Sequence, residues 1–172
     1  MAQERTGVAT FKGNPLTLVG PELQVGDQAP DFTLHSSLLD TASLSNFDGK
    51  VKLISVIPSI DTGVCDLQTR RFNEVASELG DNAAVLTVSV DTPFAQARWC
   101  GAAGAEKVTM LSDYRNQNFS YAYGVYIKEF GLAMRSIFVI DQNNKVQYVE
   151  YVAEMSEHPN YDQAIAAAKA LL

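Results

Sequence analysis

The chain has 172 residues, of which 47% are apolar and 19% are charged, proportions typical of a soluble globular protein and not of a disordered one. This length predicts a single domain over residues 1–172. The formal net charge is −7 and no basic cluster exceeds the pair Arg70-Arg71, so we expect no nucleic-acid partner.

The N-terminal segment MAQERTGVATFKGN lacks the basic-then-apolar pattern of a secretory signal. No apolar run reaches the roughly 18 residues that span a membrane, so we expect a cytoplasmic protein with no membrane partner. The two cysteines do not form a CxxC motif, and His35 and His158 are the only histidines. Because a zinc site needs about four ligands, no metal site is predicted. In a reducing compartment the cysteines are expected to be free thiols or catalytic groups.

The hydrophobic pattern alternates between strands and helices along the chain. Residues 8–20 predict a β-hairpin around a Gly-Asn-Pro turn, and residues 25–37 predict a turn and a short strand. The elements predicted after them are strands at 52–57, 83–90 and 108–111, helices at 62–79, 116–123 and 161–171, a further helix from Pro93, and a hairpin of 134–140 with 146–152.

Two of the predicted helices have clear local signals. The first has Gly80 as its stop and an inner apolar stripe made by Val64, Phe72, Val75 and Leu79. The second has Thr92 as N-cap, Pro93 at its first position and glycines at its exit.

This order of elements predicts an α/β domain with a mixed central sheet, because helices alternate with strands until a final antiparallel hairpin. It is compatible with a thioredoxin-like core that carries an N-terminal β-hairpin extension. The pattern alone does not distinguish this fold from several flavodoxin-like arrangements.

Cys65 lies at the predicted start of the first helix, directly after a buried strand. With Thr62 as N-cap it takes the third helical position, where backbone N–H groups lack partners and the helix dipole is positive. Cysteines at such sites favour the nucleophilic thiolate. Pro58 ends the strand and stiffens the loop, and Gly63 leaves space beside the thiol. The pattern indicates a reactive cysteine, with a buried space-filling thiol as the alternative.

The segment VIPSIDTGVCDLQTRRFN (56–73) closely resembles the peroxidatic motif of the peroxiredoxin family, in its thiol peroxidase branch of the atypical 2-Cys type. Four further segments resemble parts of that family in the family's order. They are FKGNPLTLVG (11–20), VDTPFAQARWCGAAG (90–104), SDYRNQNFSYAYGV (112–125) and LAMRSIFVIDQNNKV (132–146). The resemblance therefore covers nearly the whole chain.

The resemblance implies a role for each matching residue. Cys65 would attack the hydroperoxide, Thr62 would hold the peroxide and thiolate in line, and Arg135 would keep the sulfur ionised and polarise the O–O bond. Pro58 belongs to the same motif. Cys100 would be the resolving cysteine, which forms an intramolecular disulfide with Cys65. Because a disulfide needs Cα atoms within about 7 Å, we expect local unfolding of one or both helices.

The resemblance also implies the activity and the partners. We expect a peroxidase that reduces hydrogen peroxide and organic hydroperoxides in antioxidant defence, needs no cofactor, is recycled by thioredoxin and forms a homodimer. The preferred peroxide stays open. Two alternatives use the same thiols differently: a redox sensor or holdase without turnover, and a thioredoxin-like binding module with inert cysteines.

Overall fold

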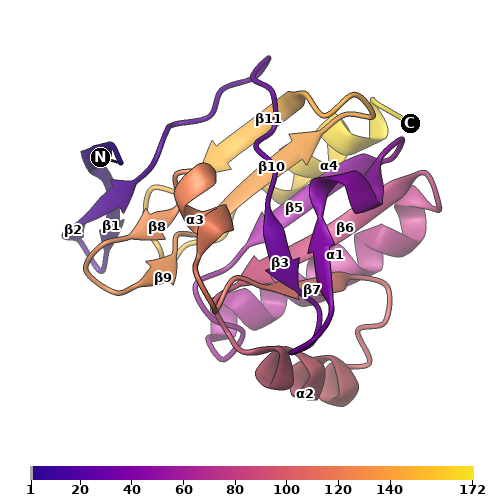
Figure 1. The fold of residues 1–172 in the computed structure, drawn as a ribbon, viewed down its shortest axis with the longest axis horizontal. Coiled ribbons are helices and arrows are strands. Elements are labelled where there is room, and N and C mark those ends of the chain that lie inside the picture. The colour runs from indigo at the N-terminus through magenta and orange to yellow at the C-terminus, as the bar shows by residue number, and fades with distance from the viewer. Residues whose placement is uncertain (1) are drawn as a thin grey trace.

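Two β-sheets organise the chain, of which the computed structural model describes residues 2–172 (Figure 1). The larger sheet has the order β11-β10-β5-β6-β7-β3-β4 and the smaller sheet the order β1-β2-β8-β9. In the larger sheet β5, β6 and β7 are parallel and the other neighbours antiparallel, so it is mixed, as predicted. The strands are β1 (Glu4–Phe11), β2 (Asn14–Val19), β3 (Thr33–His35), β4 (Thr41–Ser43), β5 (Val51–Val56), β6 (Ala83–Ser89), β7 (Thr109–Ser112), β8 (Tyr126–Ile127), β9 (Leu132–Ala133), β10 (Ser136–Ile140) and β11 (Val146–Tyr151).

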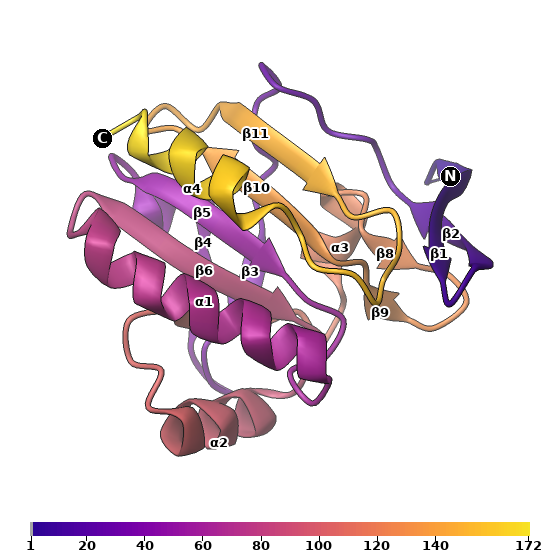
Figure 2. The same ribbon diagram turned by 180° about the vertical axis from the view of Figure 1, so that it is seen from behind.

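Three helices, α1, α2 and α4, cover one face of the larger sheet, and the short helix α3 lies on the other face. Figure 2 shows α1 and α4 side by side across the near face, with α2 beyond α1. Among residues 2–172, none of the helices combines the length and the apolar character needed to cross a membrane. The helices are η1 (Leu44–Phe47), α1 (Gly63–Leu79), α2 (Pro93–Ala103), α3 (Asn118–Ala122) and α4 (Tyr161–Lys169).

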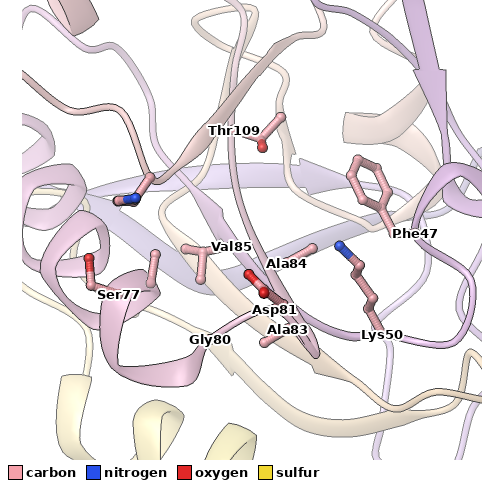
Figure 3. A pocket seen from close by; sticks show the side chains of 11 residues that line it. Phe47, Lys50, Ser77, Gly80, Asp81, Ala83, Ala84, Val85 and Thr109 are labelled. Carbon is pink, nitrogen blue, oxygen red and sulfur yellow. The ribbon is translucent and has the colours of Figure 1, made fainter.

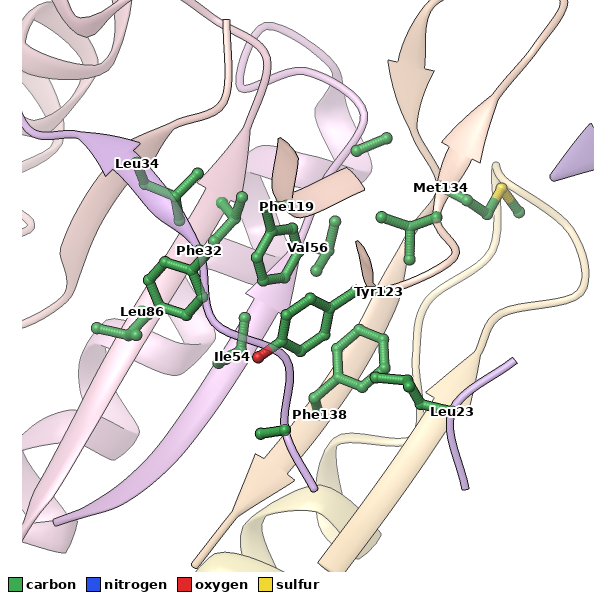
Figure 4. Packing of buried hydrophobic residues seen from close by; sticks show 14 of the residues in the cluster. Leu23, Phe32, Leu34, Ile54, Val56, Leu86, Phe119, Tyr123, Met134 and Phe138 are labelled. Carbon is green, nitrogen blue, oxygen red and sulfur yellow. The ribbon is translucent and has the colours of Figure 1, made fainter. Parts of the chain in front are cut away.

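Strand β5 is buried along its whole length because both faces of the larger sheet are covered. Ile54 and Val56 point into the cluster that contains Tyr123 (Figure 4), while Leu53 belongs to the cluster under α1 and α4. Lys52 is the one charged residue of the strand, and its Nζ donates to Asn144 Oδ1 at 2.5 Å and to the Asp141 carbonyl at 3.2 Å. Burial lowers the pKa of Lys52, against the opposing charges of Asp48 and Asp141.

The N-terminal hairpin is present, but its turn and its starting residue differ from the prediction. The turn is Lys12-Gly13, with φ values of 50° and 78°, and Asn14 already pairs with Phe11. Two consecutive residues with positive φ make the tight turn that matches strand twist, so the predicted Gly-Asn-Pro turn was wrong. The hairpin also starts earlier, at Glu4, and its strand β2 pairs with β8, which in turn pairs with β9, in a second sheet that the sequence did not predict.

The helices begin where their capping residues predict. Thr62 caps α1, and Thr92 followed by Pro93 starts α2. The predicted inner stripe of α1 was wrong in one place: Val64 is only half-buried, and Cys65, one position on, begins the buried face. A helix turns about 100° per residue, so this shift of one position places the thiol, not the valine, against the sheet.

The smaller sheet is fastened to the rest of the domain through a close backbone crossing. Gly20 and Gly124 both have positive φ, and the space of a Cβ on Gly124 is occupied by the carbonyl oxygen of Pro21. Across this crossing the buried Arg5 donates from Nη1 to the Gly20 carbonyl at 2.8 Å and from Nη2 to the Gly124 carbonyl at 3.0 Å. Only glycine permits this approach.

Replacing Gly124 with alanine is therefore expected to destabilise the protein by about 2–4 kcal/mol, because it adds backbone strain to a clash with the Pro21 backbone. Gly49→Ala is the matched control, since Gly49 also has positive φ but has no atom near its missing Cβ. Urea unfolding followed by circular dichroism measures both. An equal decrease in the free energy of unfolding in the two variants would mean that the backbone crossing at Gly124 is not tightly packed.

Candidate active site

Cys65 is buried at the third position of α1. Its backbone N–H donates to Thr62 Oγ1 at 3.3 Å, and its carbonyl accepts from Thr69 Oγ1 at 2.8 Å. The cap orders the first turn, and the unpaired amides and dipole of that turn favour a negative charge. The sulfur thus lies where a helix start stabilises an anion.

The loop between β5 and α1 is held by Asp91, which follows the neighbouring strand β6. Asp91 Oδ1 accepts from Ser59 Oγ at 3.0 Å, and Oδ2 accepts from the Ile60 N–H at 2.8 Å and from Ser89 Oγ at 2.6 Å. Pro58 is buried in this loop. Sequence reasoning missed Asp91, because its partners lie about 30 residues away and no local pattern marks them.

Arg135 directly precedes β10, the strand that pairs with β5 on the edge away from β6. Ser136 pairs with Val56, so Arg135 lies at the carboxyl end of β5, where the loop to α1 begins. The side chain is only 2% exposed. Its Nε donates to the Met155 carbonyl at 3.0 Å and its Nη1 donates to Gln68 Oε1 at 2.9 Å. Both partners are neutral, so neither offsets the positive charge of the guanidinium.

Gln68 connects this arginine to the cysteine helix. It lies one turn after Cys65 on the same buried face of α1, and its Nε2 donates to Ser55 Oγ at 2.7 Å. Residues three apart on a helix are neighbours, so the Arg135 guanidinium is held one helical turn from Cys65. The available sequence signal was the polar pair Gln68-Thr69 within a mostly apolar face, which buried hydrogen bonding explains.

Tyr161, at the start of α4, borders the same site. Its ring packs against Phe72 with centroids 5.5 Å apart, and its hydroxyl lies 2.7 Å from His158 Nδ1. Burial raises the pKa of Tyr161; the charge on Arg135 lowers it and that on Cys65 raises it. The hydroxyl therefore lies within the electrostatic reach of both groups.

Cys100 lies on α2, and the two cysteines are not bonded to each other. It is half-buried and packs against the apolar cluster to which Cys65 belongs. Burial raises the pKa of the Cys100 thiol, so this thiol is held in its protonated form while α2 is folded. The structure thus brings Thr62, Cys65 and Arg135 to one end of the sheet, with Cys100 to the side.

A pocket lies elsewhere in the fold, at the amino ends of β5 and β6 and the C-terminal end of α1 (Figure 3). It has a volume of about 360 Å³ and includes the side chains of Lys50, Asp81 and Lys107. Cys65 is at the other end of both α1 and the strands, so this pocket is not part of the site. In the described part of the chain, no three His, Cys, Asp or Glu side chains gather as metal ligands would.

The arrangement has the chemical parts of a nucleophilic site. A buried thiol at a helix start can supply a nucleophile. A guanidinium and the hydroxyl of Thr62 can donate to a substrate oxygen that gains negative charge as its bond breaks. Because these donors are fixed before the substrate arrives, they need little reorganisation during the reaction.

Comparison with known proteins agrees with this chemistry. The Redoxin family model matches residues 24–165. A thiol peroxidase of Bacillus subtilis is 63% identical over 163 residues, which cover 95% of this chain and 97% of that protein. One of Streptococcus pneumoniae is 54% identical over 164 residues, which cover 95% of this chain and all of that protein.

Solved structures agree as well. A peroxiredoxin-like protein from Aquifex aeolicus superposes with a TM-score of 0.90 at 40% identity, over 98% of both chains. The thiol peroxidase from Chromobacterium violaceum gives 0.81 at 26% identity, over 90% of this chain and 91% of that one. These likenesses confirm the thioredoxin-like fold with its N-terminal hairpin. The chain belongs to the redoxin family, and within it to the thiol peroxidases, peroxiredoxin enzymes that reduce hydroperoxides.

Gln68→Met is expected to slow the reaction with peroxide by about tenfold, because the loss of a hydrogen bond to a charged group frees the Arg135 guanidinium to turn away. Gln96→Met is the matched control. Gln96 is another buried helical glutamine, and its Nε2 bonds to Ser89 Oγ and to the Leu111 carbonyl, both at 3.0 Å, away from Arg135. Stopped-flow rates of peroxide consumption compare the two variants, and equal slowing in both would remove Gln68 from the site.

Proposed function

We propose that Cys65 is the nucleophile of this peroxidase and that Cys100 resolves the product as an intramolecular disulfide. The observation that carries the proposal is the contact between Gln68 and Arg135, which holds a buried, charge-unpaired guanidinium one turn from a cysteine at a helix start. A thiolate there gains both the helix dipole and a nearby cation.

In the first step the Cys65 thiolate attacks the terminal oxygen of a hydroperoxide. An S–O bond forms and the O–O bond breaks. The departing alkoxide or hydroxide takes a proton and leaves as alcohol or water, and Cys65 becomes a sulfenic acid. Thr62 and Arg135 donate hydrogen bonds to the peroxide and stabilise the charge on the leaving oxygen. Pro58 keeps the loop that carries Thr62 in a fixed shape.

In the second step Cys100 loses its proton and attacks the sulfur of Cys65. An S–S bond forms, the S–O bond breaks, and the departing hydroxide takes up the proton that Cys100 released and leaves as water. The disulfide closes a loop of 35 residues, for which the chain-entropy model gives a stabilisation of on the order of 4 kcal/mol. Both thiols lie on folded helices that border one apolar cluster, so this step requires local unfolding.

A dithiol reductant completes the cycle, and thioredoxin is the one that the family resemblance supports. With such a reductant the protein would act in a reducing compartment, and we propose the cytoplasm. We further propose that residues 1–172 act as one domain and that two copies form a dimer. Leu67 and Phe94, near the N-terminal ends of α1 and α2, are large apolar side chains that remain exposed and suit burial against a second copy.

The two cysteines are expected to have separate phenotypes. Cys65→Ser removes peroxide reduction and keeps the fold. Cys100→Ser reduces one peroxide per Cys65, fails to turn over with thioredoxin, its reductase and NADPH, and accumulates sulfinic acid. Mass spectrometry and NADPH oxidation measure both. Full activity of Cys65→Ser would overturn the assignment, and wild-type oxidation without turnover would favour a redox sensor.

Arg135→Ala is expected to slow peroxide reduction by about 100- to 1000-fold, the effect of losing one donor to a developing oxyanion. Arg135→Lys restores only part of the rate, since an ammonium group does not reproduce the planar fork that reaches Gln68 and Met155 together. Second-order rate constants measured at several pH values test this. A rate constant unchanged in the alanine variant would assign Arg135 a purely structural role.

A further inference from the structure

The residues next to the two cysteines bind each other. Asp66 directly follows Cys65, Trp99 directly precedes Cys100, and Trp99 Nε1 donates to Asp66 Oδ1 at 2.5 Å. Arg70 completes the contact: its Nε donates to Asp66 Oδ2 at 2.9 Å, and its guanidinium lies 5.4 Å from the centre of the Trp99 ring. We call these three residues the interhelix cluster, because it joins the first turns of α1 to α2.

The hydrogen bond in this cluster is of the strong kind. Trp99 is buried, so its N–H has lost water as an alternative partner. Hydrogen bonds, from Arg70 first and from Trp99 next, keep the pKa of Asp66 below its ordinary value, against partial burial. The acceptor is therefore a carboxylate at neutral pH, and bonds to an ionised acceptor are about twice as strong as neutral ones.

The geometry of the cluster works against a bond between the cysteines. Neighbouring residues on a helix point about 100° apart. Because Asp66 points at α2, the buried side chain of Cys65 points about 100° from that direction. Because Trp99 points at α1, the side chain of Cys100 likewise points about 100° from the direction of α1. To bring the two sulfurs together, at least one helix has to unwind or rotate at its cysteine, and that movement separates Asp66 from Trp99.

We propose that Asp66 and Trp99 are positioning residues that hold the helices in the peroxide-reactive arrangement, and that separation of their side chains sets the rate at which the Cys65 sulfenic acid is resolved. The proposal rests on the proposed function, since it requires a disulfide between Cys65 and Cys100. Two reactions compete for the sulfenic acid. Cys100 converts it to a disulfide with loss of water, and a second peroxide transfers an oxygen to it, leaving sulfinic acid and one alcohol or water.

Trp99→Phe tests the proposal, because phenylalanine keeps an aromatic ring beside Arg70 but has no N–H to donate. Disulfide formation is expected to become about tenfold faster, the equilibrium factor of one charge-assisted hydrogen bond. The sulfinic fraction at equal peroxide falls by a similar factor, while the rate of the first oxidation stays within about twofold. Quenched-flow mass spectrometry with a sulfenic-acid trap separates thiol, sulfenic acid, disulfide and sulfinic acid.

Two controls distinguish the loss of the hydrogen bond between Trp99 and Asp66 from a general weakening of the contacts of α2. Gln96→Met removes buried hydrogen bonds of α2 without touching the cluster. Asp61→Asn breaks the exposed ion pair between Asp61 and Arg98, a contact to α2 at 3.0 Å from the loop before α1. Neither control is expected to change resolution by more than about twofold. An acceleration in Gln96→Met equal to that in Trp99→Phe would overturn the proposal.

Asp66→Asn supplies a second variant in case Trp99→Phe folds poorly. Asparagine keeps an acceptor oxygen and loses the charge, so an acceleration between wild type and Trp99→Phe is expected. Trp99 is the only tryptophan of the chain, and its emission should shift on disulfide formation in wild type but not when Cys100→Ser stops at sulfenic acid. Wild-type resolution rates in both cluster variants would overturn the positioning role alone. A wild type that forms no Cys65–Cys100 disulfide would overturn the proposed function and this inference with it.

Discussion

A positive charge buried without a negative partner is the constraint around which the site is built. Within residues 2–172 no carboxylate lies within salt-bridge distance of Arg135, and its side chain donates hydrogen bonds to the amide of Gln68 and to the backbone carbonyl of Met155. Removing such a cation from water is costly unless an anion compensates it. In the reaction that we propose, an anionic sulfur at Cys65 or the charge on a departing peroxide oxygen would supply that compensation.

Hydrogen bonds from the surrounding polar groups fix the helix start of α1 relative to Arg135. Two glutamines, Gln68 on α1 and Gln96 on α2, each fasten a helix to a serine of the strand beneath it, Ser55 or Ser89. Asp91 then ties the loop before α1 to the strand that precedes α2. The two cysteine-bearing helices are thus held to adjacent parallel strands by hydrogen bonds from these polar side chains.

Local signals made part of this predictable. A threonine N-cap, a proline at the first helical position and a glycine stop act within a few residues, so the starts of α1 and α2 and the place of Cys65 followed from sequence. Contacts between distant segments did not. Three contacts join residues 30 or more positions apart: those of Asp91 with the loop before α1, that of Gln68 with Arg135, and the pairing of the N-terminal hairpin with β8. Such contacts are set by tertiary packing. Val64 was misplaced for a different reason, because a hydrophobic pattern does not distinguish an apolar residue from the cysteine beside it.

The hydrogen bonds of Arg5 have a consequence for how the chain folds during its synthesis. The hairpin that carries this arginine is made before its partners, since one of its acceptors, the Gly124 carbonyl, follows 119 residues later. The strands that complete its sheet, β8 and β9, also come from that late part of the chain. On the ribosome the hairpin therefore waits with an unpaired edge and an unburied guanidinium until about three-quarters of the chain has emerged. Contacts of such long separation slow folding and leave nascent chains open to wrong pairings.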